Sequence, residues 1–495
     1  MSTASAAGPP DVGRVGTGSD DGRLVGPRLD ADGTGRISTD PADGPTHRRG
    51  GTAGRLVVPV LLALAATALY GTLSTLQWRS LVAPSWDLGI FSELAKSYAG
   101  LSAPIVPIKG DGVNLLGDHF HPILVLLAPV WWVWPSGLAL LWTQAALFGL
   151  SAIPLARLAM ERLGPIAGTA AGLAYVLSFG LQAAQDVQFH EIAFAVPIMA
   201  MALTRLLRGR LLAACLWGAL LVFCKEDLGL TVVVLGGVVA LRDRAGRLLG
   251  LGLAMWGAGW FVLSTFVILP ALNTAGQYDY TGNLGSVLDV LGPVDKWVTL
   301  AMLVLAAGVI GLRSPILALM LPTLAWRFTG TVEFYWTWYW HYNAILMPIA
   351  LAALLDVAPR AGRWTRAAAI GASAAVTLAL GTAMPLARLL EPQTWEVSWR
   401  AAPAARAMAA VPDGSVVAAE IPLLAPLVPD HDVQWLHGPN TRVPRCAVLD
   451  DYAFSWNGAV PPDAAQWADE HYRVEPGTFT QTFEEGGFRV VCRAG

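Results

Sequence analysis

Apolar segments recur along the chain between residues 56 and 390, and this feature constrains the fold more than any other. A helix needs about 20 mostly apolar residues to cross a hydrocarbon core about 30 Å thick. Several of the segments are shorter than this, so the sequence does not fix the residues at which these helices begin and end. The pattern predicts an all-α polytopic membrane protein with about eleven transmembrane helices. The segments are Leu56–Leu76, 138–157, 166–185, 191–207, 211–224, 227–241, 248–272, 297–312, 314–330, 344–358 and 367–387.

Charged residues between these segments support the count. If the N-terminus is inside, every later inner loop carries arginine, as the positive-inside rule requires. The segment 121–134 is also apolar, but counting it as a span would reverse five arginine loops. We therefore expect it to form a juxtamembrane helix in the outer interface, where Trp131, Trp132 and Trp134 suit the headgroup region. The inner loops carry Arg157, Arg162, Arg205, Arg208, Arg210, Arg242, Arg244, Arg247, Arg313, Arg360, Arg363 and Arg366.

Composition excludes several classes of protein. With 54% hydrophobic and 14% charged residues, the chain is not an ordinary soluble enzyme. A net charge of −3 without a basic stripe argues against a nucleic-acid partner. The four cysteines form no CxxC or Cys/His cluster, so no zinc ribbon is expected. There is also no Gly-rich phosphate loop, Ser-His-Asp order or metalloprotease helix.

The chain divides into three expected regions. Residues 1–50 are rich in small and polar residues and predict a disordered cytoplasmic tail. Residues 51–390 form the transmembrane domain. Residues 391–495 alternate strand-like and helix-like runs and follow an odd number of spans, which predicts a small extracytoplasmic α/β domain. Outside the cell Cys446 and Cys492 can pair, but spacing alone does not show that they meet.

Ionisable and hydrogen-bonding residues gather on the outer side of this topology. Charges at membrane depth are costly, so such groups normally face one another or a water-filled cavity. We therefore expect a polar cavity that opens outward. The residues concerned include Asp87, Glu93, Lys96, Asp111, Asp118, His119, His121, Asp186, His190, Glu191, Lys225, Glu226, Asp227, Tyr278, Tyr280, Glu333, His341 and Tyr342.

Five short strings carry a resemblance to a known family. They are DLGIF at 87–91, GDHFHPI at 117–123, FHE at 189–191, KEDLGL at 225–230 and WHYNAILMP at 340–348. They resemble the bacterial membrane-protein family called domain of unknown function 2079, which is grouped with the GT-C glycosyltransferases. GT-C enzymes carry an essential acidic residue in a first outer loop of juxtamembrane helices.

This resemblance implies an activity and its partners. GT-C enzymes transfer sugars from polyprenyl-phosphate donors on the outer face of the membrane. The implied protein is a plasma-membrane glycosyltransferase that acts on a cell-envelope glycan, lipid or protein. Its implied partners are the lipid bilayer, the polyprenyl-phosphate sugar donor and that acceptor.

The resemblance also implies roles for individual residues. Asp87 corresponds to the first-loop carboxylate, which takes the proton from the acceptor hydroxyl, and Asp118 is the second candidate catalytic carboxylate. Five cationic or donor side chains are expected to stabilise the departing phosphate, namely His119, His121, His190, Lys225 and His341. The expected substrate-binding set also includes Glu191, Glu226, Asp227 and Tyr342.

Each of these sites has an alternative interpretation. Asp87 has the residue type of a helix N-cap, and Asp118 with His119 can simply order its loop. The His190-Glu191 step fits a divalent metal ion or a phosphate, so the cofactor stays open. Residues 225–227 can form a structural turn, and the aromatic run 335–342 fits an interfacial belt as well as a sugar platform.

Two non-enzymatic functions also remain open from the sequence. One is a transporter, flippase or envelope-assembly scaffold, and the other is an inactive GT-C relative that retains lipid binding. The inner halves of the predicted spans are nearly free of ionisable groups. Because a transporter needs polar groups along its path, this pattern favours chemistry or binding on one side.

Overall fold

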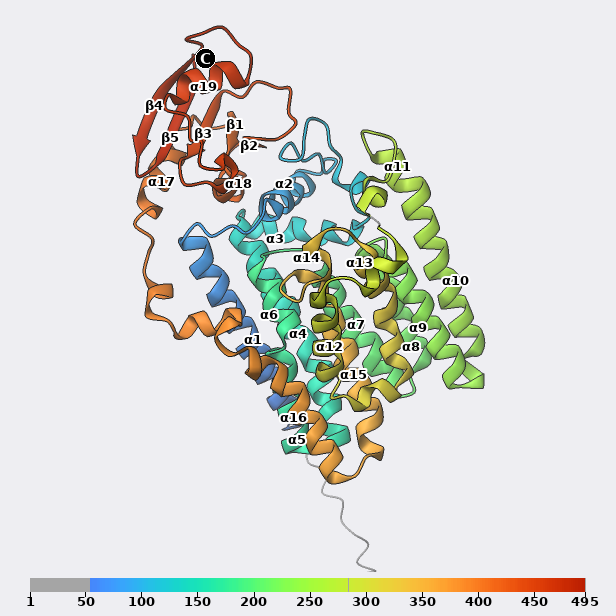
Figure 1. Ribbon diagram of the computed structural model, residues 1–495. Coiled ribbons are helices and arrows are strands. Elements are labelled where there is room, and N and C mark those ends of the chain that lie inside the picture. Colours follow the sequence, from blue (N-terminus) through green and yellow to red (C-terminus); the bar gives the residue numbers. More distant parts are fainter. Residues whose placement is uncertain (1–53, 284, 495) are drawn as a thin grey trace, which may run out of the picture. The chain divides into compact units, whose positions relative to one another are not determined.

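The structure is a computed structural model that describes residues 54–283 and 285–494. The predicted disordered tail, residues 1–50, lies outside the described residues. The described part is mostly helical, with a small sheet near the C-terminus (Figure 1). The helices of the first 380 residues are α1 (Gly54–Arg79), α2 (Asp87–Ala99), α3 (Leu127–Val133), α4 (Gly137–Leu163), α5 (Pro165–Val176), α6 (Phe179–Asp186), α7 (Ile192–Leu207), α8 (Leu211–Ala219), α9 (Leu228–Arg242), α10 (Arg247–Leu263), α11 (Leu269–Leu272), α12 (Val294–Ala306), α13 (Leu321–Thr329), α14 (Glu333–Trp336), α15 (Leu346–Val357) and α16 (Arg363–Leu380).

The predicted apolar segments are helical, as expected for backbone that must satisfy its own hydrogen bonds in lipid. Within the described residues, five helices are long and apolar enough to cross a membrane, and a bent pair makes a sixth if it is one span. The shorter apolar helices include 192–207, 211–223 and 228–242. The all-α polytopic class is therefore confirmed, whereas the count of eleven stays a prediction. The long helices are Leu56–Arg79, Gly137–Leu163, Pro165–Asp186, Arg244–Leu272 and Arg363–Ala383, and the bent pair is Glu333–Asn343 with Leu346–Arg360.

Glycines allow α9 and α10 to approach closely. A Cβ at Gly236 would lie 2.4 Å from the carbonyl oxygen of Gly250, and one at Gly257 would lie 2.5 Å from that of Gly229. Small residues at such a contact replace side-chain volume with direct backbone packing, which is how helices associate when lipid removes the hydrophobic driving force. Substitution at either glycine would therefore separate the two helices.

The segment between α1 and α4 contains the two helices α2 and α3, which pack against each other. In Figure 1, α3 runs across the axis of α4. The helix is apolar yet exposed, since Trp132 is 63% and Val133 is 87% exposed. The predicted helix at 121–134 thus exists as the 3-10 turn Pro122–Leu126 followed by α3. Its exposed indole and valine suit a lipid interface.

The C-terminal segment forms a five-stranded sheet in the order β2-β1-β3-β5-β4. The first three strands are parallel, and β5 is antiparallel to both β3 and β4. Strands β1, β2, β3 and β5 and helices α17 and α19 lie in the strand-like and helix-like runs of residues 391–495. The sequence pattern missed β4, which is a polar edge strand, and α18, which is a short helix of apolar residues. The elements are α17 (Ala401–Ala409), β1 (Val416–Ala419), α18 (Ile421–Leu427), β2 (Asp432–Trp435), β3 (Cys446–Asp450), α19 (Ala464–His471), β4 (Phe479–Glu485) and β5 (Phe488–Arg493).

Alternate residues of the sheet belong to two different cores. Val417 and Val448 pack with α17, α18 and the main helical core, whereas Ala418 and Leu449 pack with α19. This alternation follows from the period of two along a strand, which sends successive side chains to opposite faces. The sheet therefore has helices on both faces, as the predicted α/β class requires.

The sheet is closed by a disulfide between Cys446 of β3 and Cys492 of β5. These residues are direct partners in the antiparallel ladder. The pairing that the sequence left open is thus present in the structure, while Cys215 and Cys224 are free and buried.

Removing this disulfide should destabilise the sheet. Cross-linking residues 46 positions apart restricts the unfolded chain and contributes about 4 kcal/mol in the chain-entropy account. We expect a Cys446→Ala, Cys492→Ala double variant to unfold at a lower temperature, measured by differential scanning fluorimetry. The Cys215→Ala variant is the control. Thiol titration of unfolded, non-reduced wild type should count two free thiols, and a count of four would contradict the disulfide.

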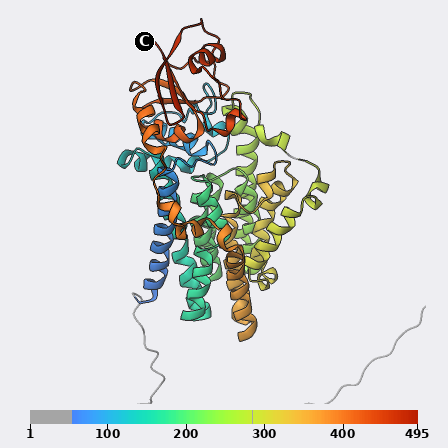
Figure 2. The same cartoon turned by 60° about the vertical axis from the view of Figure 1, so that its left-hand side comes forward.

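Helix α2 is joined to the C-terminal sheet by polar contacts. The Glu93 carboxylate accepts a hydrogen bond from the backbone N–H of Val433 at 3.1 Å. The Lys96 ammonium donates to the carbonyl oxygens of Val428 and His431 at 2.7 Å each. Gly89 lies so close to Leu424 of α18 that a Cβ there would approach it to 2.8 Å. Figures 1 and 2 show the sheet next to α2.

Glu93 should make stability depend on pH. Burial raises the pKa of its carboxyl from 4.5 to about 7, against the attraction of Lys96. Because the folded-state pKa lies above the unfolded one, the folded protein binds the proton more tightly, and stability falls as pH rises through this window. The full loss is about 3 kcal/mol. We expect Glu93→Gln to remove this slope in thermal unfolding between pH 5 and pH 8, whereas the exposed control Glu475→Gln keeps it. An unchanged slope in Glu93→Gln would contradict the assignment.

Candidate functional site

Four helices begin at one cluster of polar side chains. Asp87 is the first residue of α2, and the other helices follow His190-Glu191, Lys225-Glu226-Asp227 and His341-Tyr342-Asn343. Contacts between these segments, given below, bring the four helix N-termini together. Each helix N-terminus carries partial positive charge and unpaired backbone N–H groups. The cluster therefore combines carboxylates and imidazoles with converging helix dipoles.

Asp87 faces the cluster and does not cap its helix. The hydroxyl of Ser85 donates to Asp87 Oδ2 at 2.6 Å, and His190 Nε2 lies 3.4 Å from the same oxygen. The N-cap position is Trp86, and no side chain caps the helix there. Burial raises the pKa of Asp87, but His190 and Ser85 outweigh burial and hold it below its ordinary value. The side chain keeps 26% exposure, so an ionised carboxylate is accessible.

His190 is held between a glutamine and a second histidine. Its ring stacks on that of His341 with centroids 3.7 Å apart. Its backbone N–H donates to Gln144 Oε1 at 3.0 Å, and the Gln144 amide in turn donates to the carbonyl oxygens of Ala184 and Gln188. Gln188 itself has a φ of 73°, a conformation that costs a non-glycine residue energy. These contacts in the turn before α7 position the His190 ring next to Asp87.

Glu191 and Lys225 form an ion pair, with the ammonium 2.6 Å from Glu191 Oε1. The two side chains are only 3% and 12% exposed. Burial opposes charge on both groups, but their mutual attraction overrides it, lowering the pKa of Glu191 and raising that of Lys225. The pair joins the turn before α7 to the turn before α9.

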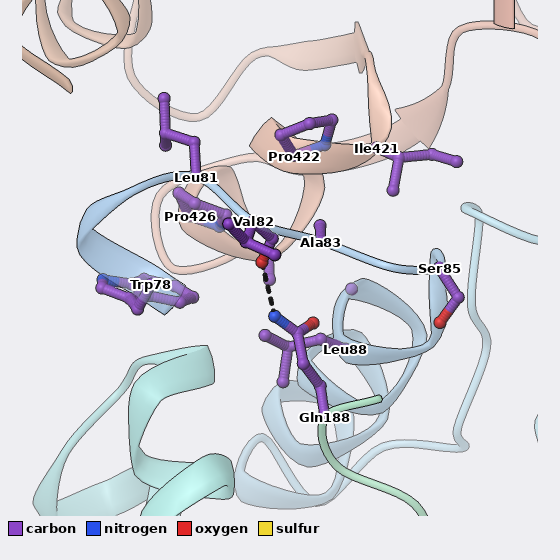
Figure 3. A pocket seen from close by; sticks show the side chains of 12 residues that line it. Trp78, Leu81, Val82, Ala83, Ser85, Leu88, Gln188, Ile421, Pro422 and Pro426 are labelled. Atoms are coloured by element: carbon purple, nitrogen blue, oxygen red, sulfur yellow. Dashed lines mark hydrogen bonds between the residues drawn. The ribbon is translucent and has the colours of Figure 1, made fainter. Parts of the chain in front are cut away.

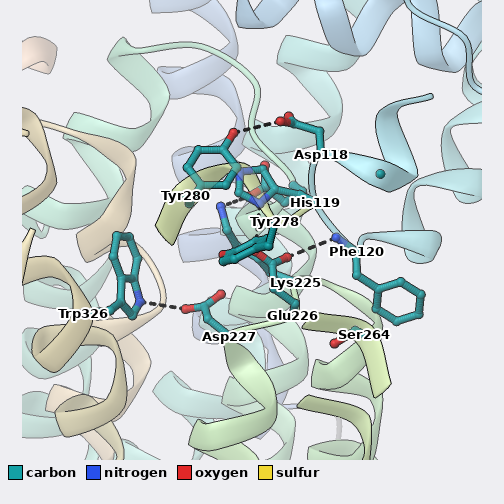
Figure 4. A network of polar contacts seen from close by, with 12 residues as sticks. Asp118, His119, Phe120, Lys225, Glu226, Asp227, Ser264, Tyr278, Tyr280 and Trp326 are labelled. Atoms are coloured by element: carbon teal, nitrogen blue, oxygen red, sulfur yellow. Dashed lines mark hydrogen bonds and ion pairs between the residues drawn. The ribbon is translucent and has the colours of Figure 1, made fainter. Parts of the chain in front are cut away.

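Glu226 binds the first outer loop (Figure 4). Its Oε1 lies 2.8 Å from His119 Nδ1 and accepts from the Tyr278 hydroxyl, while its Oε2 accepts from the backbone N–H of Phe120. Burial opposes the charged carboxylate, but His119 outweighs it and lowers the pKa of Glu226 to about 2. The pKa of His119 is raised, because the attraction of Glu226 and Asp118 overcomes burial and the repulsion of Lys225.

Asp118 also lies in this network. Its two oxygens contact Lys109 at 2.6 Å and the Tyr280 hydroxyl at 2.9 Å, and the Tyr280 ring stacks on His119 (Figure 4). Burial raises the pKa of Asp118, but the charges of His119 and Lys109 lower it overall. Asp118 is therefore held by an ion pair and a tyrosine hydroxyl, and its catalytic role stays a prediction.

Asp227 contacts α13. Its Oδ2 accepts from the indole N–H of Trp326 at 2.9 Å, and burial raises its pKa to about 6 against the attraction of Lys225. Lys225, Glu226 and Asp227 thus each contact a different segment, while their opposite charges still attract one another. The Tyr342 ring packs edge-on against Trp326.

The aromatic run 335–342 is partly buried. Trp336 is 8% and His341 is 5% exposed, whereas Tyr339 is 43% exposed. Tyr335 packs edge-on against Tyr342. Arg327, fully buried in α13, donates to the carbonyl oxygens of Tyr335 and Thr337 and to Asn343 Oδ1, which fixes the path of this segment.

His121 is buried beside the network and packs edge-on against Phe91. Burial lowers its pKa to about 4, so its imidazole is neutral at physiological pH. His121 is thus a neutral donor or acceptor and not a cation. Within residues 54–283 and 285–494, no group of three or more His, Cys, Asp or Glu side chains is arranged to hold a metal ion.

A small pocket of about 20 Å³ is lined by Ser85 and Leu88, which lie on either side of Asp87 in the sequence (Figure 3). Its walls come from the end of α1, the segment 81–89 and the start of α18. The lining is mostly apolar, with Ser85 and Gln188 as its polar side chains. The Gln188 amide donates to the carbonyl oxygen of Val82 at the pocket wall. Ser85 therefore connects this apolar space to the carboxylate of Asp87.

A second polar network lies at the opposite ends of α7, α9 and α15. Asp356 pairs with Arg242 and accepts from the Ser314 hydroxyl at 2.7 Å. Arg162 donates to the carbonyl oxygens of Leu207 and Leu355. Arg162 thus binds the last carbonyls of two helices, where positive charge is favourable. This end of the helices is thus less free of ionisable groups than the sequence indicated.

Comparison with known proteins assigns the chain to a family. A family model described as "Predicted membrane protein (DUF2079)" matches residues 77–435. The chain belongs to this family. The matched range of this DUF2079 protein runs from the end of α1 to the last residue of β2, so it contains every candidate site residue named above. No curated protein matches the sequence.

The fold of this DUF2079 protein is similar to that of ArnT from Cupriavidus metallidurans, solved bound to undecaprenyl phosphate. The TM-score is 0.53 at 14% sequence identity, and the match covers 89% of this chain and 98% of the ArnT chain. At this identity the comparison shows a likeness in fold alone.

Some site residues of this DUF2079 protein have no clear signal in the sequence. Ser85 and Trp326 contact candidate carboxylates, but a serine in a loop and a tryptophan in an apolar segment are common. Gln144 and Arg327 are different, because each is a strongly polar residue inside an apolar segment. Polar residues buried at membrane depth normally have a specific partner, so the position of Gln144 and Arg327 inside apolar segments was the signal that could have identified them.

Proposed function

We propose that this protein is a polyprenyl-phosphate-sugar-dependent glycosyltransferase that acts on a cell-envelope acceptor. The observation that carries this proposal is the convergence of an accessible, ionised Asp87 with His190, His341 and the Glu191-Lys225 pair at the N-termini of four helices. This arrangement offers a proton acceptor and an anion-binding environment side by side. The fold similarity to ArnT bound to undecaprenyl phosphate supports the same class of donor.

In the proposed reaction, Asp87 is the general base. It takes the proton of an acceptor hydroxyl while the hydroxyl oxygen bonds to C1 of the donor sugar. The bond between C1 and the phosphate oxygen breaks, and polyprenyl phosphate leaves with the electron pair. His190 and Ser85 hold the Asp87 carboxylate in its ionised form, and the His341 ring fixes His190 from behind.

The leaving phosphate is proposed to lie near Lys225 and the helix N-termini. Anions bind at helix N-termini because the unpaired N–H groups and the dipole both favour negative charge. Lys225 adds a full positive charge at the turn before α9. His119, whose pKa is raised by Glu226 and Asp118, adds a second positive charge when it is protonated.

The topology that goes with this function is also a proposal. We place the cluster on the outer side of the plasma membrane, with the N-terminus cytoplasmic, about eleven spans and residues 391–495 as an extracytoplasmic domain. The Cys446-Cys492 disulfide supports an oxidising compartment for that domain. The exposed indole of α3 supports an interfacial helix in the first outer loop.

The test uses purified full-length protein in nanodiscs. Short-chain polyprenyl phosphates that carry a hexose or a pentose are the probes, and envelope extracts supply acceptors. We expect saturable binding and release of free polyprenyl phosphate that depends on the extract. Binding without release across all probes and extracts would overturn the enzyme in favour of a lipid-binding relative. No binding of any probe would favour a transporter or scaffold.

A further inference from the structure

The C-terminal sheet gathers a set of side chains that the proposed reaction does not use. Strand β1 lies between β2 and β3 and is parallel to both, so the carboxyl ends of the three strands meet at one edge. From β1 the chain turns through α18 to β2, and from β2 it crosses back over β1 to β3. Open α/β sheets bind ligands in the crevice where connections diverge in this way. The residues that follow the three strands are Glu420, His437 and Ser455.

Glu420 is a fully buried carboxylate without a strong cation. Its Oε1 lies 2.9 Å from His437 Nε2, and its Oε2 accepts from the Ser455 hydroxyl at 2.9 Å. Among the described residues, neither arginine nor lysine forms an ion pair with it. Burying a carboxylate on such weak partners is costly, and stability alone gives no reason for it. Glu420 therefore orients His437 and Ser455, and these two partly exposed side chains offer hydrogen bonds to a polar neutral ligand.

Aromatic side chains surround this polar group. The His437 ring packs edge-on against Trp435, Trp456 and Trp467, with centroids 5.9, 5.0 and 6.4 Å away. Trp435 Nε1 is a buried donor without a hydrogen-bond partner. In the loop after β3, Phe454 is 70% exposed. Aromatic faces beside a few convergent polar groups fit a ligand with both C–H faces and hydroxyl groups, which describes a sugar ring.

The aromatic wall continues to the candidate active site. The Trp435 ring lies 5.0 Å from that of Trp86, edge to face. Trp86 directly precedes Asp87 in the chain, and the Lys109 ammonium lies 6.0 Å from the Trp86 ring. Two successive ring contacts thus link His437 to the residue next to the proposed base.

We propose that Glu420, His437, Ser455 and the adjoining tryptophans form a carbohydrate-binding site, and that its occupant is the glycan acceptor. The assignment of the occupant rests on the proposed function, whereas the carbohydrate site itself does not. A glycan held here extends along Trp435 and Trp86 toward Asp87.

The test measures binding of maltose, cellobiose and mannobiose to full-length protein in nanodiscs, since maltoside detergents would compete. Intrinsic tryptophan fluorescence and calorimetry report binding. We expect at least one disaccharide to bind with a Kd of about a millimolar. His437→Ala should weaken binding about tenfold or more. Glu475→Gln should bind like wild type, because Glu475 is exposed and lies outside the proposed sugar site.

Controls keep the result interpretable. A thermal unfolding transition and an intact disulfide show that a variant is folded. If His437→Ala does not fold, Ser455→Ala is the milder substitution that replaces it in the binding assay. No binding by wild type, or unchanged binding in both variants, would overturn the carbohydrate site. Binding that depends on His437, in a protein that fails to release polyprenyl phosphate, would retain the site and overturn only the acceptor assignment.

Discussion

An Asp87→Asn variant is expected to lose sugar transfer by about 10²- to 10⁴-fold while it still binds the donor. Asparagine has nearly the same shape as aspartate, and its amide oxygen can still accept the hydrogen bond from Ser85. It cannot take a proton from the acceptor hydroxyl, so only the chemical step should suffer. The variant should therefore show a lower kcat with little change in KM for the donor.

Steady-state assays at varied donor concentration measure kcat and KM, and single-turnover assays with the protein in excess over the donor isolate the chemical step. The matched control is Asp111→Asn, which makes the same change in the same loop at a carboxylate that accepts hydrogen bonds from Thr441 and Arg442. The control should keep transfer near the wild-type rate. Equal loss in both variants would mean that the loop needs its carboxylates for order, and unchanged turnover in Asp87→Asn would overturn the base assignment.

A Lys225→Met variant is expected to lose about 3–5 kcal/mol of stability, because it leaves the Glu191 carboxylate buried without its partner. Methionine keeps most of the length and apolar contacts of the lysine side chain. The measurement is thermal or denaturant unfolding in nanodiscs, followed by tryptophan fluorescence. Transfer should fall as well.

The double variant Lys225→Met, Glu191→Gln separates structure from chemistry. Neutralising both partners removes the unpaired charge, so stability should largely return. If Lys225 contacts the phosphate, donor affinity and transfer should stay low in the folded double variant. Recovery of both stability and transfer would mean that the pair is structural and that the phosphate has other ligands.

Local physics explains why the helices and the grouping of the site were predictable from the sequence. Apolar runs in a membrane chain have almost no option except helix, so 138–157 became α4 and 191–207 became α7. The grouping of His190, Lys225 and His341 was also predictable, because the sequence places all three on the same side of the predicted membrane. Charged and polar side chains at membrane depth are stabilised by facing one another. The structure brings these residues into one network.

Pairing within the site was not predictable in the same way. The sequence does not show whether Lys225 forms its ion pair with Glu191 or with its neighbours Glu226 and Asp227. The pairing depends on the orientation of the turn before α9. The path of residues 335–342 depends on Arg327 of α13, whose guanidinium donates hydrogen bonds to the carbonyl oxygens of Tyr335 and Thr337. Such contacts arise only once the helices are packed.

The convergence of four helix N-termini has a consequence for ionic strength. Attraction between exposed charges is screened over a Debye length of about 10 Å at 0.1 M salt, whereas buried charges and backbone dipoles are screened much less. At this site the attraction for a phosphate comes from main-chain N–H groups and from a lysine that is mostly shielded from water. Donor affinity should therefore change little between dilute buffer and high salt, unlike that of a protein that captures anions with surface lysines.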